Sequence, residues 1–329
     1  MDVRRILIIF FIALFISAAA NATAKNTFAV IKSKELQQID LIIKGFTESF
    51  PEAAVVMLDL EGKSDTKKVA DFIRKNRPSA IICLGALAAN TTIAVEKEIP
   101  IIFSLVINYR RYNFLMQSNV TGISMEIPPL TLFSQFRLLM PAVNSIGIPY
   151  HPSASSEIVN DAEKAAAQLN IKLVKIPVED PSKLGEFLSS RLAECSGLWM
   201  LADTQLYNLK TRALKELILF SKNNRKPLLA FSENFLKMGA FFSISIDYKS
   251  IGSQISLVSK RIVQDNIRPS MIPVSPPIGT YTVLNRIVAQ KLMGAALDES
   301  IYDIVDKVYP SLQKNGSEDA ADGDEQDAE

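Results

Sequence analysis

Three serine hydroxyls lie close together in the segment YHPSASSE, residues 150–157, where an apolar strand pattern is followed by a helical one. The start of a helix presents free backbone N–H groups and the positive end of the helix dipole, which together favour a bound carboxylate or phosphate. Ser153, Ser155 and Ser156 would add hydroxyl donors beside Tyr150, at the end of the strand. The same atoms would serve if the serines only cap the helix, so ligand binding and capping both stay open.

Asp203 follows a second apolar strand pattern, GLWMLADT at residues 197–204. Its carboxylate could hold a cationic group such as an α-ammonium, or it could cap the long helix that the sequence predicts over residues 204–224. Asp247 offers the same choice after the strand pattern FFSISI. No nucleophile, base and orienting group come together around either residue, which argues against catalysis.

The composition of the 329-residue chain excludes several classes of function. Its 36 basic residues nearly balance its 35 acidic ones, which disfavours a nucleic-acid-binding domain. One histidine and two cysteines leave no multi-histidine metal site and no disulfide framework. The phosphate-binding and nucleophile motifs of common enzymes are missing. We therefore predict no catalytic residue, metal site, cofactor or nucleic-acid partner, with an enzyme acting through Asp203 and His151 as the alternative.

The elements that would position these residues alternate between strand and helix along the chain, beginning with the strand pattern TFAVIKS at residues 27–33. Such alternation predicts βαβ units and parallel sheets. About ten strands are expected, which is high for one sheet of this length. The sequence thus predicts an α/β fold of two doubly wound parallel-sheet lobes joined by a hinge. The predicted boundaries are 25–124 with about 247–280 for lobe 1, and 125–246 with about 281–310 for lobe 2.

Ligands of open α/β sheets bind beyond the carboxyl ends of the strands. That rule selects the residues after each predicted strand as ligand contacts. The predicted binding residues are Ser33, Gly85, Ala86, Asn108, Tyr150, Ser153, Ser155, Ser156, Asp203, Ser232 and Asp247.

The two ends of the chain differ in composition from the body. Arg4 and Arg5, the apolar run 6–20 and small residues near position 22 predict a cleaved signal peptide over residues 1–22, with an uncleaved anchor as the alternative. No cysteine follows closely to carry a lipid, so we expect a periplasmic protein. The acidic end, residues 315–329, is predicted to be a disordered tail.

Several segments, in their order and spacing, resemble the family of ABC-transporter substrate-binding proteins with the type I periplasmic-binding fold, in the branch related to tryptophan and tyrosine uptake. The segments that carry the resemblance are IICLGALAAN (81–90), IPIIFSLV (99–106), NVTGIS (119–124), LLMPAVNSIGIPYHPSASSE (138–157), GLWMLADT (197–204), GAFFSISIDYKSIGSQ (239–254) and IRPSMIPVSPPIGTYTVLN (267–285).

This resemblance implies a small ligand held in the cleft between two lobes that close by a hinge motion. Ser33, Gly85 and Ala86 would face the ligand from the first lobe, and the serines, Tyr150, Asp203 and Ser232 from the second. Hydroxyls and helix N–H groups would hold the carboxylate of an amino acid, and Asp203 its ammonium. The implied partner is an ABC permease in the inner membrane, for a receptor that is a monomer. A sensor that signals to a membrane receptor or kinase is the alternative.

Two departures from the family pattern bear on the ligand. The family usually has an Asp-Pro pair where this chain reads INYR, residues 107–110. Its loop after the first strand usually contains aromatic or small polar residues, where this chain reads Lys32-Ser33-Lys34. Together with Arg110 and Arg111, these lysines would suit an anionic solute.

Overall fold

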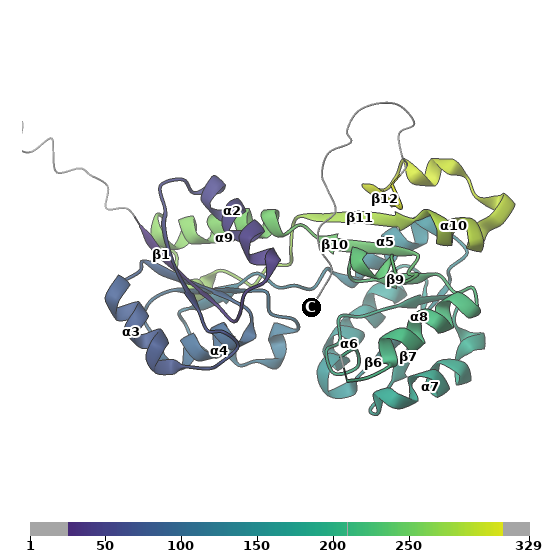
Figure 1. Cartoon of the computed structure of the whole chain (residues 1–329), viewed down its shortest axis with the longest axis horizontal. Coiled ribbons are helices and arrows are strands. Elements are labelled where there is room, and N and C mark those ends of the chain that lie inside the picture. Colours follow the sequence, from purple (N-terminus) through teal and green to yellow (C-terminus); the bar gives the residue numbers. More distant parts are fainter. Residues whose placement is uncertain (1–25, 209, 312–329) are drawn as a thin grey trace, which may run out of the picture.

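The computed structural model describes residues 26–208 and 210–311 as an α/β fold of two lobes (Figure 1). The predicted signal peptide, 1–22, and the predicted acidic tail, 315–329, lie outside these residues. Among the helices that the structure describes, none is long and apolar enough to cross a membrane.

The first lobe is built on a parallel sheet with the strand order β2-β1-β3-β4-β5. Its strands are β1 (Thr27–Lys32), β2 (Ala54–Asp59), β3 (Ala80–Leu84), β4 (Ile101–Ser104) and β5 (Val120–Gly122). Its helices are α2 (Gln37–Ser49), α3 (Thr66–Asn76), α4 (Ala86–Val95) and α9 (Tyr248–Val263). Strand β3, AIICL, is buried along its whole length. A continuous apolar run of this kind fits a parallel strand with helices on both faces.

The second lobe is built on a sheet with the order β12-β11-β10-β9-β8-β6-β7, parallel except where β10 meets β11. Its strands are β6 (Ser145–Tyr150), β7 (Lys172–Pro177), β8 (Gly197–Trp199), β9 (Leu228–Ala230), β10 (Phe242–Ile246), β11 (Thr280–Asn285) and β12 (Lys307–Tyr309). Its α-helices are α5 (Pro129–Leu139), α6 (Pro152–Gln168), α7 (Leu184–Ser190), α8 (Ala213–Asn223) and α10 (Arg286–Met293). The predicted fold class, two mostly parallel α/β lobes, is confirmed.

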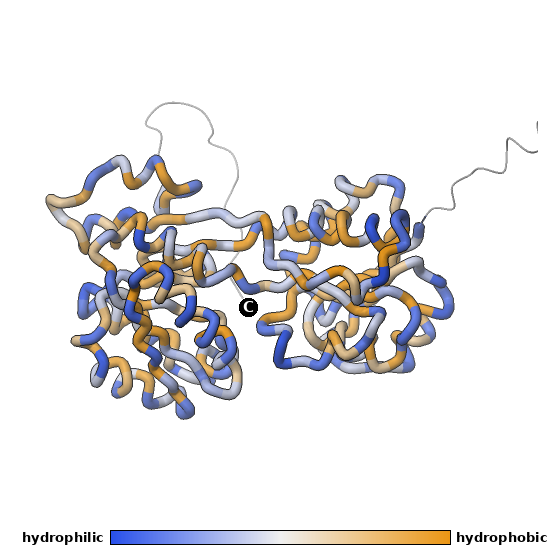
Figure 2. The backbone as a smooth tube through the Cα atoms, turned by 180° about the vertical axis from the view of Figure 1, so that it is seen from behind, coloured by the Kyte–Doolittle hydropathy of each residue, from blue (hydrophilic) through white to orange (hydrophobic). Residues whose placement is uncertain are grey.

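Short 3-10 turns complete the described chain: η1 (Tyr109–Arg111), η2 (Phe114–Met116), η3 (Pro181–Lys183), η4 (Leu192–Glu194), η5 (Glu233–Phe235), η6 (Pro269–Met271), η7 (Gly294–Ala296) and η8 (Glu299–Tyr302). Figure 2 shows hydrophobic residues concentrated in the interior of each lobe. Leu284, Ala289 and Ile301 join the core of the second lobe, so the last described helices belong with its sheet.

The chain crosses between the lobes after β5, after β10 and before β11. Because of the second crossing, α9 returns to the first lobe and packs along α2 (Figure 1). The two helix backbones touch at glycines: a Cβ on Gly252 would lie 2.0 Å from the Ile42 carbonyl oxygen, and one on Gly45 would lie 1.9 Å from that of Lys249. Only glycine permits this approach.

The single long helix predicted over residues 204–224 is wrong, because α8 begins at Ala213. The Asp203 side chain accepts hydrogen bonds from the backbone N–H groups of Gln205 (2.9 Å) and Leu206 (3.0 Å). An acidic side chain that satisfies its own neighbouring backbone favours a local turn over a helix.

Candidate functional site

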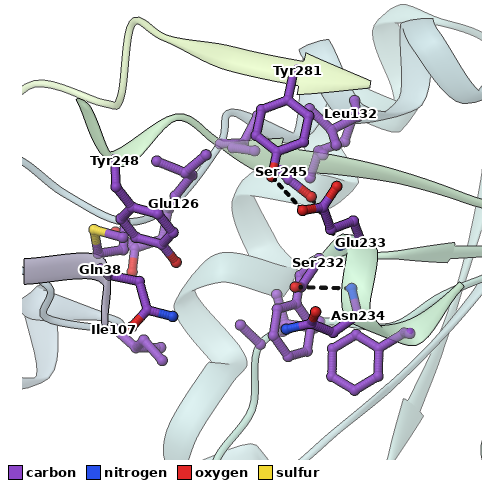
Figure 3. A pocket seen from close by; sticks show the side chains of 18 of the residues that line it. Gln38, Ile107, Glu126, Leu132, Ser232, Glu233, Asn234, Ser245, Tyr248 and Tyr281 are labelled. Atoms are coloured by element: carbon purple, nitrogen blue, oxygen red, sulfur yellow. Dashed lines mark hydrogen bonds between the residues drawn. The ribbon is translucent and has the colours of Figure 1, made fainter. Parts of the chain in front are cut away.

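A cavity of about 540 Å³ lies between the two lobes (Figure 3). The first lobe contributes the start of α2 and Ile107, and the second contributes the loops after β8 and β9. The crossing segments complete its walls with residues 125–127, Ile246 and Tyr248. In Figure 3, Gln38, Ile107, Glu126 and Tyr248 face Ser232, Glu233 and Tyr281 across the cavity.

Five aromatic side chains supply much of the apolar lining: Trp199, Phe231, Phe235, Tyr248 and Tyr281. Trp199 is 2% exposed and packs edge to face against Phe133, with ring centroids 5.2 Å apart. Phe231 and Phe235 pack against each other with ring centroids 4.8 Å apart. Such a wall suits a ligand with an apolar or aromatic portion.

Of the two carboxylates in the lining, Glu233 is already paired inside the second lobe. The Tyr281 hydroxyl donates to Glu233 Oε1 at 2.9 Å, and Lys307 Nζ lies 3.5 Å from Oε2. Lys307 also lies over the Tyr281 ring, 4.0 Å from its centroid. Burial and the Glu233 carboxylate raise the pKa of Tyr281 to about 12, so Tyr281 remains a neutral donor.

The second carboxylate, Glu126, belongs to the crossing segment that follows β5. It accepts a hydrogen bond from the Asn108 backbone N–H. Burial raises its pKa, against the opposing effects of its hydrogen bonds and of the Arg110 charge. Arg110 itself is bonded to Asp161 on α6, at 2.6 Å. No lysine, arginine or histidine is among the described residues that line the main cavity.

A smaller cavity of about 270 Å³ adjoins the main one, and the two share Glu126, Ile127 and Ile158. Asn108 lies in its wall in the left-handed backbone conformation, with φ 49°. The Asn108 side-chain amide donates to the Ala154 carbonyl oxygen on α6 of the opposite lobe. Its Oδ1 is buried and has no hydrogen-bond partner among the described residues.

The start of α6, which the sequence marks as an anion site, receives an anion from the protein itself. The His151 backbone N–H and the Ser155 hydroxyl each donate to Asp203 Oδ2 at 2.8 Å. With the two N–H groups that Oδ1 accepts, Asp203 has four donors and is 2% exposed. The start of α6, predicted to bind a ligand carboxylate, and Asp203, predicted to bind a ligand ammonium, are therefore hydrogen-bonded to each other.

The neighbouring serines of α6 bond locally. Ser156 donates to the Pro152 carbonyl oxygen at 2.6 Å, and the Ser153 hydroxyl lies 2.9 Å from His151 Nδ1. Tyr150 ends β6 and is half-buried. These residues are not among those that line either cavity.

In the first lobe, the Ser33 hydroxyl accepts the Ala88 N–H at 3.0 Å and so caps α4. Gly85 precedes that helix with φ 97°, and Ala86 is its first residue. Asp247 caps α9 by accepting the Lys249 N–H at 3.0 Å. Of the predicted binding residues, Ser232 lines the main cavity and Asn108 the smaller one.

Sequence reasoning missed Glu126 and the aromatic residues of the cavity. Ser232-Glu233 and Asp247-Tyr248 do follow predicted strands, so the strand-end rule points to their neighbourhood. A signal for Glu126 was available, because a segment that crosses between lobes borders the space between them. Trp199 and Tyr281 lie in strands, where an apolar pattern does not distinguish a cavity wall from a core.

Comparison with known proteins identifies relatives along most of the chain. The family model described as "ABC transporter substrate binding protein" matches residues 27–309. The "Tyrosine-binding protein" of Clostridioides difficile (strain R20291) is 20% identical over 281 residues, which are 80% of this chain and 80% of that protein. An uncharacterized protein of Rickettsia prowazekii (strain Madrid E) is 23% identical over 273 residues, 81% of this chain and 84% of its own.

Solved structures share the fold. A ligand-free, open substrate-binding protein from Clostridium difficile superposes with a TM-score of 0.68 at 16% identity, covering 81% of this chain and 94% of its own. The ABC domain in complex with L-Trp from Streptococcus pneumonia gives a TM-score of 0.59 at 18% identity, covering 87% and 100%. The family match over nearly all of the described residues and the two-lobed fold agree, and this chain belongs to the family of ABC transporter substrate-binding proteins.

Proposed function

We propose that this protein is a receptor for an ABC importer, and that it encloses a small zwitterionic solute with an apolar or aromatic side chain in the cavity between its lobes. The observation that carries the proposal is the lining of that cavity, which combines five aromatic rings, neutral hydrogen-bonding groups and two carboxylates, with no basic side chain from residues 26–208 or 210–311. An amino acid offers the complementary groups.

The size and the polar groups of the cavity support this ligand class. A volume of about 540 Å³ lies within the range of small-molecule sites. Ser232, Asn234 and Gln38 place hydroxyl and amide groups along the wall, where they could hold a ligand carboxylate. The names of two relatives, one called tyrosine-binding and one solved with L-Trp, point the same way.

An anionic solute fits less well, because the basic residues that suggested it are engaged elsewhere. Lys32 is bonded to Glu35 and lies 3.5 Å from Asp59. Arg110 is bonded to Asp161, and Arg111 lies over the Tyr112 ring, 5.3 Å from its centroid. None of these cations lines the main cavity, and Arg110, which lines the smaller one, is the cation paired with Asp161.

The proposal also includes the export, the location, the oligomeric state and the lobe boundaries that the sequence predicts. Residues 1–22 would direct export and be removed, and the receptor would act in the periplasm as a monomer that delivers its ligand to a permease. Lobe 1, 25–124 with 247–280, and lobe 2, 125–246 with 281–310, would close about the crossing segments. Family membership supports a place outside the cytoplasm.

The test is a thermal-shift screen of the chain from residue 23 onward, followed by titration calorimetry of each hit. L-tryptophan, L-tyrosine and L-leucine represent the proposed class, and phosphate, citrate and ribose represent the others. A ligand at 100 times its dissociation constant adds about 2.7 kcal/mol of stability, which is a shift of a few degrees for a chain of this size. Stabilisation by the anions or the sugar, and by no amino acid, would overturn the proposed ligand class.

A further inference from the structure

We propose that Glu126 is the residue that recognises the positive charge of the ligand, with the ligand's ammonium group bound where the main and smaller cavities meet. This inference rests on the proposed function and assigns its specificity. It also moves the ammonium site away from Asp203, for which the resemblance to known receptors had suggested that role.

The two carboxylates of the main cavity differ in their hydrogen-bond and ion-pair partners. Glu233 has a hydroxyl donor at 2.9 Å and a lysine at 3.5 Å, so its charge is balanced within the second lobe. Glu126 accepts the Asn108 N–H and a hydrogen bond from the Ser124 side chain. Arg110 lines the smaller cavity and its charge acts on Glu126, but its guanidinium is bonded to Asp161. A half-buried carboxylate that no cation contacts directly is costly, and a ligand ammonium would offset that cost.

Asn108 provides a second, independent observation at the same place. It lies beside Glu126 in the wall of the smaller cavity, it is 5% exposed, and its Oδ1 lacks a partner among the described residues. The assignment of that oxygen is fixed by the amide nitrogen, which donates to the Ala154 carbonyl oxygen. Buried acceptors are nearly always satisfied, so an unpaired one on a residue that shares a cavity wall with a carboxylate indicates a missing donor. An ammonium group, with its N–H donors, would satisfy both acceptors.

Glu126 lies on a segment that connects the two lobes, so a ligand charge bound there can affect how the lobes are placed. Its segment joins β5 of the first lobe to α5 of the second. Asn108, which donates to Glu126 from the first lobe, also donates to α6 of the second. A ligand that neutralises Glu126 therefore acts on a contact that already connects both lobes.

The experiment compares wild-type protein with Glu126→Gln on matched ligand series, by titration calorimetry. One series is L-tryptophan, tryptamine and indole-3-propionate, and a second is L-tyrosine, tyramine and 3-(4-hydroxyphenyl)propionate. In each, the amine lacks the carboxylate and the acid lacks the ammonium. We expect wild-type protein to bind the amino acid or the amine of at least one series more tightly than the acid. Glu126→Gln should weaken those ligands about 10- to 100-fold, the range of one charge-assisted hydrogen bond, and leave the acid unchanged or improved.

Glu233→Gln is the matched comparison, because it removes the other carboxylate of the same cavity. Because Glu233 is already paired with Lys307, its loss should lower the ratio of amine to acid affinity by less than the loss of Glu126 does. An unaltered amine preference in Glu126→Gln, or its loss in Glu233→Gln instead, would overturn the assignment while the proposed function stands. Absence of binding to wild-type protein by every member of both series and by L-leucine would overturn the proposed ligand class, and this inference with it.

Discussion

At the scale of single residues, Asp203 lies where the sequence suggests a ligand contact, but its hydrogen bonds all go to the protein itself. A carboxylate at the end of a strand can bind a ligand, or it can accept hydrogen bonds from its own chain. Here it accepts four hydrogen bonds and is 2% exposed, so its role is to tie the start of α6 to the loop after β8. Removal of a buried acceptor leaves its donors unpaired, and each unpaired donor costs about 1–3 kcal/mol.

We therefore predict that Asp203→Asn lowers the stability of the protein by at least about 3 kcal/mol, because an amide nitrogen would face donors in place of an oxygen. Chemical denaturation measures this directly. Ser155→Ala, which removes one donor and keeps the carboxylate, should cost about 1 kcal/mol. The opposite pattern, a fully stable Asp203→Asn protein that has lost only the preference for ammonium-bearing ligands, would return Asp203 to the site.

A second prediction at this scale concerns pH and Glu126. Burial raises its pKa above the ordinary value of 4.5. An ammonium ligand needs the ionised carboxylate, so its affinity should fall as the pH is lowered through this raised pKa, beginning above pH 4.5. Titrations between pH 8 and pH 4.5 would measure the loss, and Glu126→Gln should remove this part of the pH dependence.

The raised pKa of Glu126 also makes the stability of the ligand-free protein depend on pH. A carboxyl whose pKa is raised on folding contributes stability that is fully present below its unfolded pKa and is lost as the pH rises through its folded pKa. Glu126→Gln should therefore be more stable than wild-type protein at neutral pH, and the difference should shrink toward pH 4.5. A constant difference at every pH would mean that Glu126 does not titrate in this window.

At the scale of elements, periodicity predicted the two sheets but not the contacts between them. Buried strands such as β3 and the alternation of strand and helix follow from local pattern, so the fold class was accessible. The predicted boundaries placed residues 247–280 in the first lobe, but the packing of α9 on α2 and the cavity lining that Tyr248 adds depend on pairings distant in sequence. The start of α8 was missed because Asp203 satisfies two backbone N–H groups and shortens the predicted helix.

The contact between α2 and α9 gives a prediction of its own. Gly252→Ala would place a methyl group 2.0 Å from the Ile42 carbonyl oxygen, and a backbone atom cannot move aside cheaply. We expect a loss of about 2–3 kcal/mol, measured by thermal or urea unfolding. Gly185→Ala in α7 is the control, because the nearest atom to its added carbon is 3.6 Å away. That change should be neutral or stabilising by up to about 1 kcal/mol.

At the scale of the whole molecule, the side chains that bridge the lobes decide how readily the lobes stay together. Arg110, from the first lobe, binds Asp161 on α6 of the second at 2.6 Å. Both side chains are partly exposed, at 51% and 39%, so solvent screens the pair and its worth is at most about 1 kcal/mol. That amount is small for folding but matters for a balance between open and closed forms, where each 1.4 kcal/mol is tenfold.

Asp161→Asn should therefore leave the unfolding temperature nearly unchanged, enlarge the radius of gyration of the ligand-free protein in small-angle X-ray scattering, and weaken ligand binding by up to about fivefold. Glu163→Gln is the matched control. It lies two positions along the same helix and loses the same charge, but its partner Lys175 belongs to its own lobe. The effect of Asp161→Asn should vanish at high salt, where the pair is screened. Equal changes in both variants would show that net charge, and not the bridge between the lobes, sets the balance.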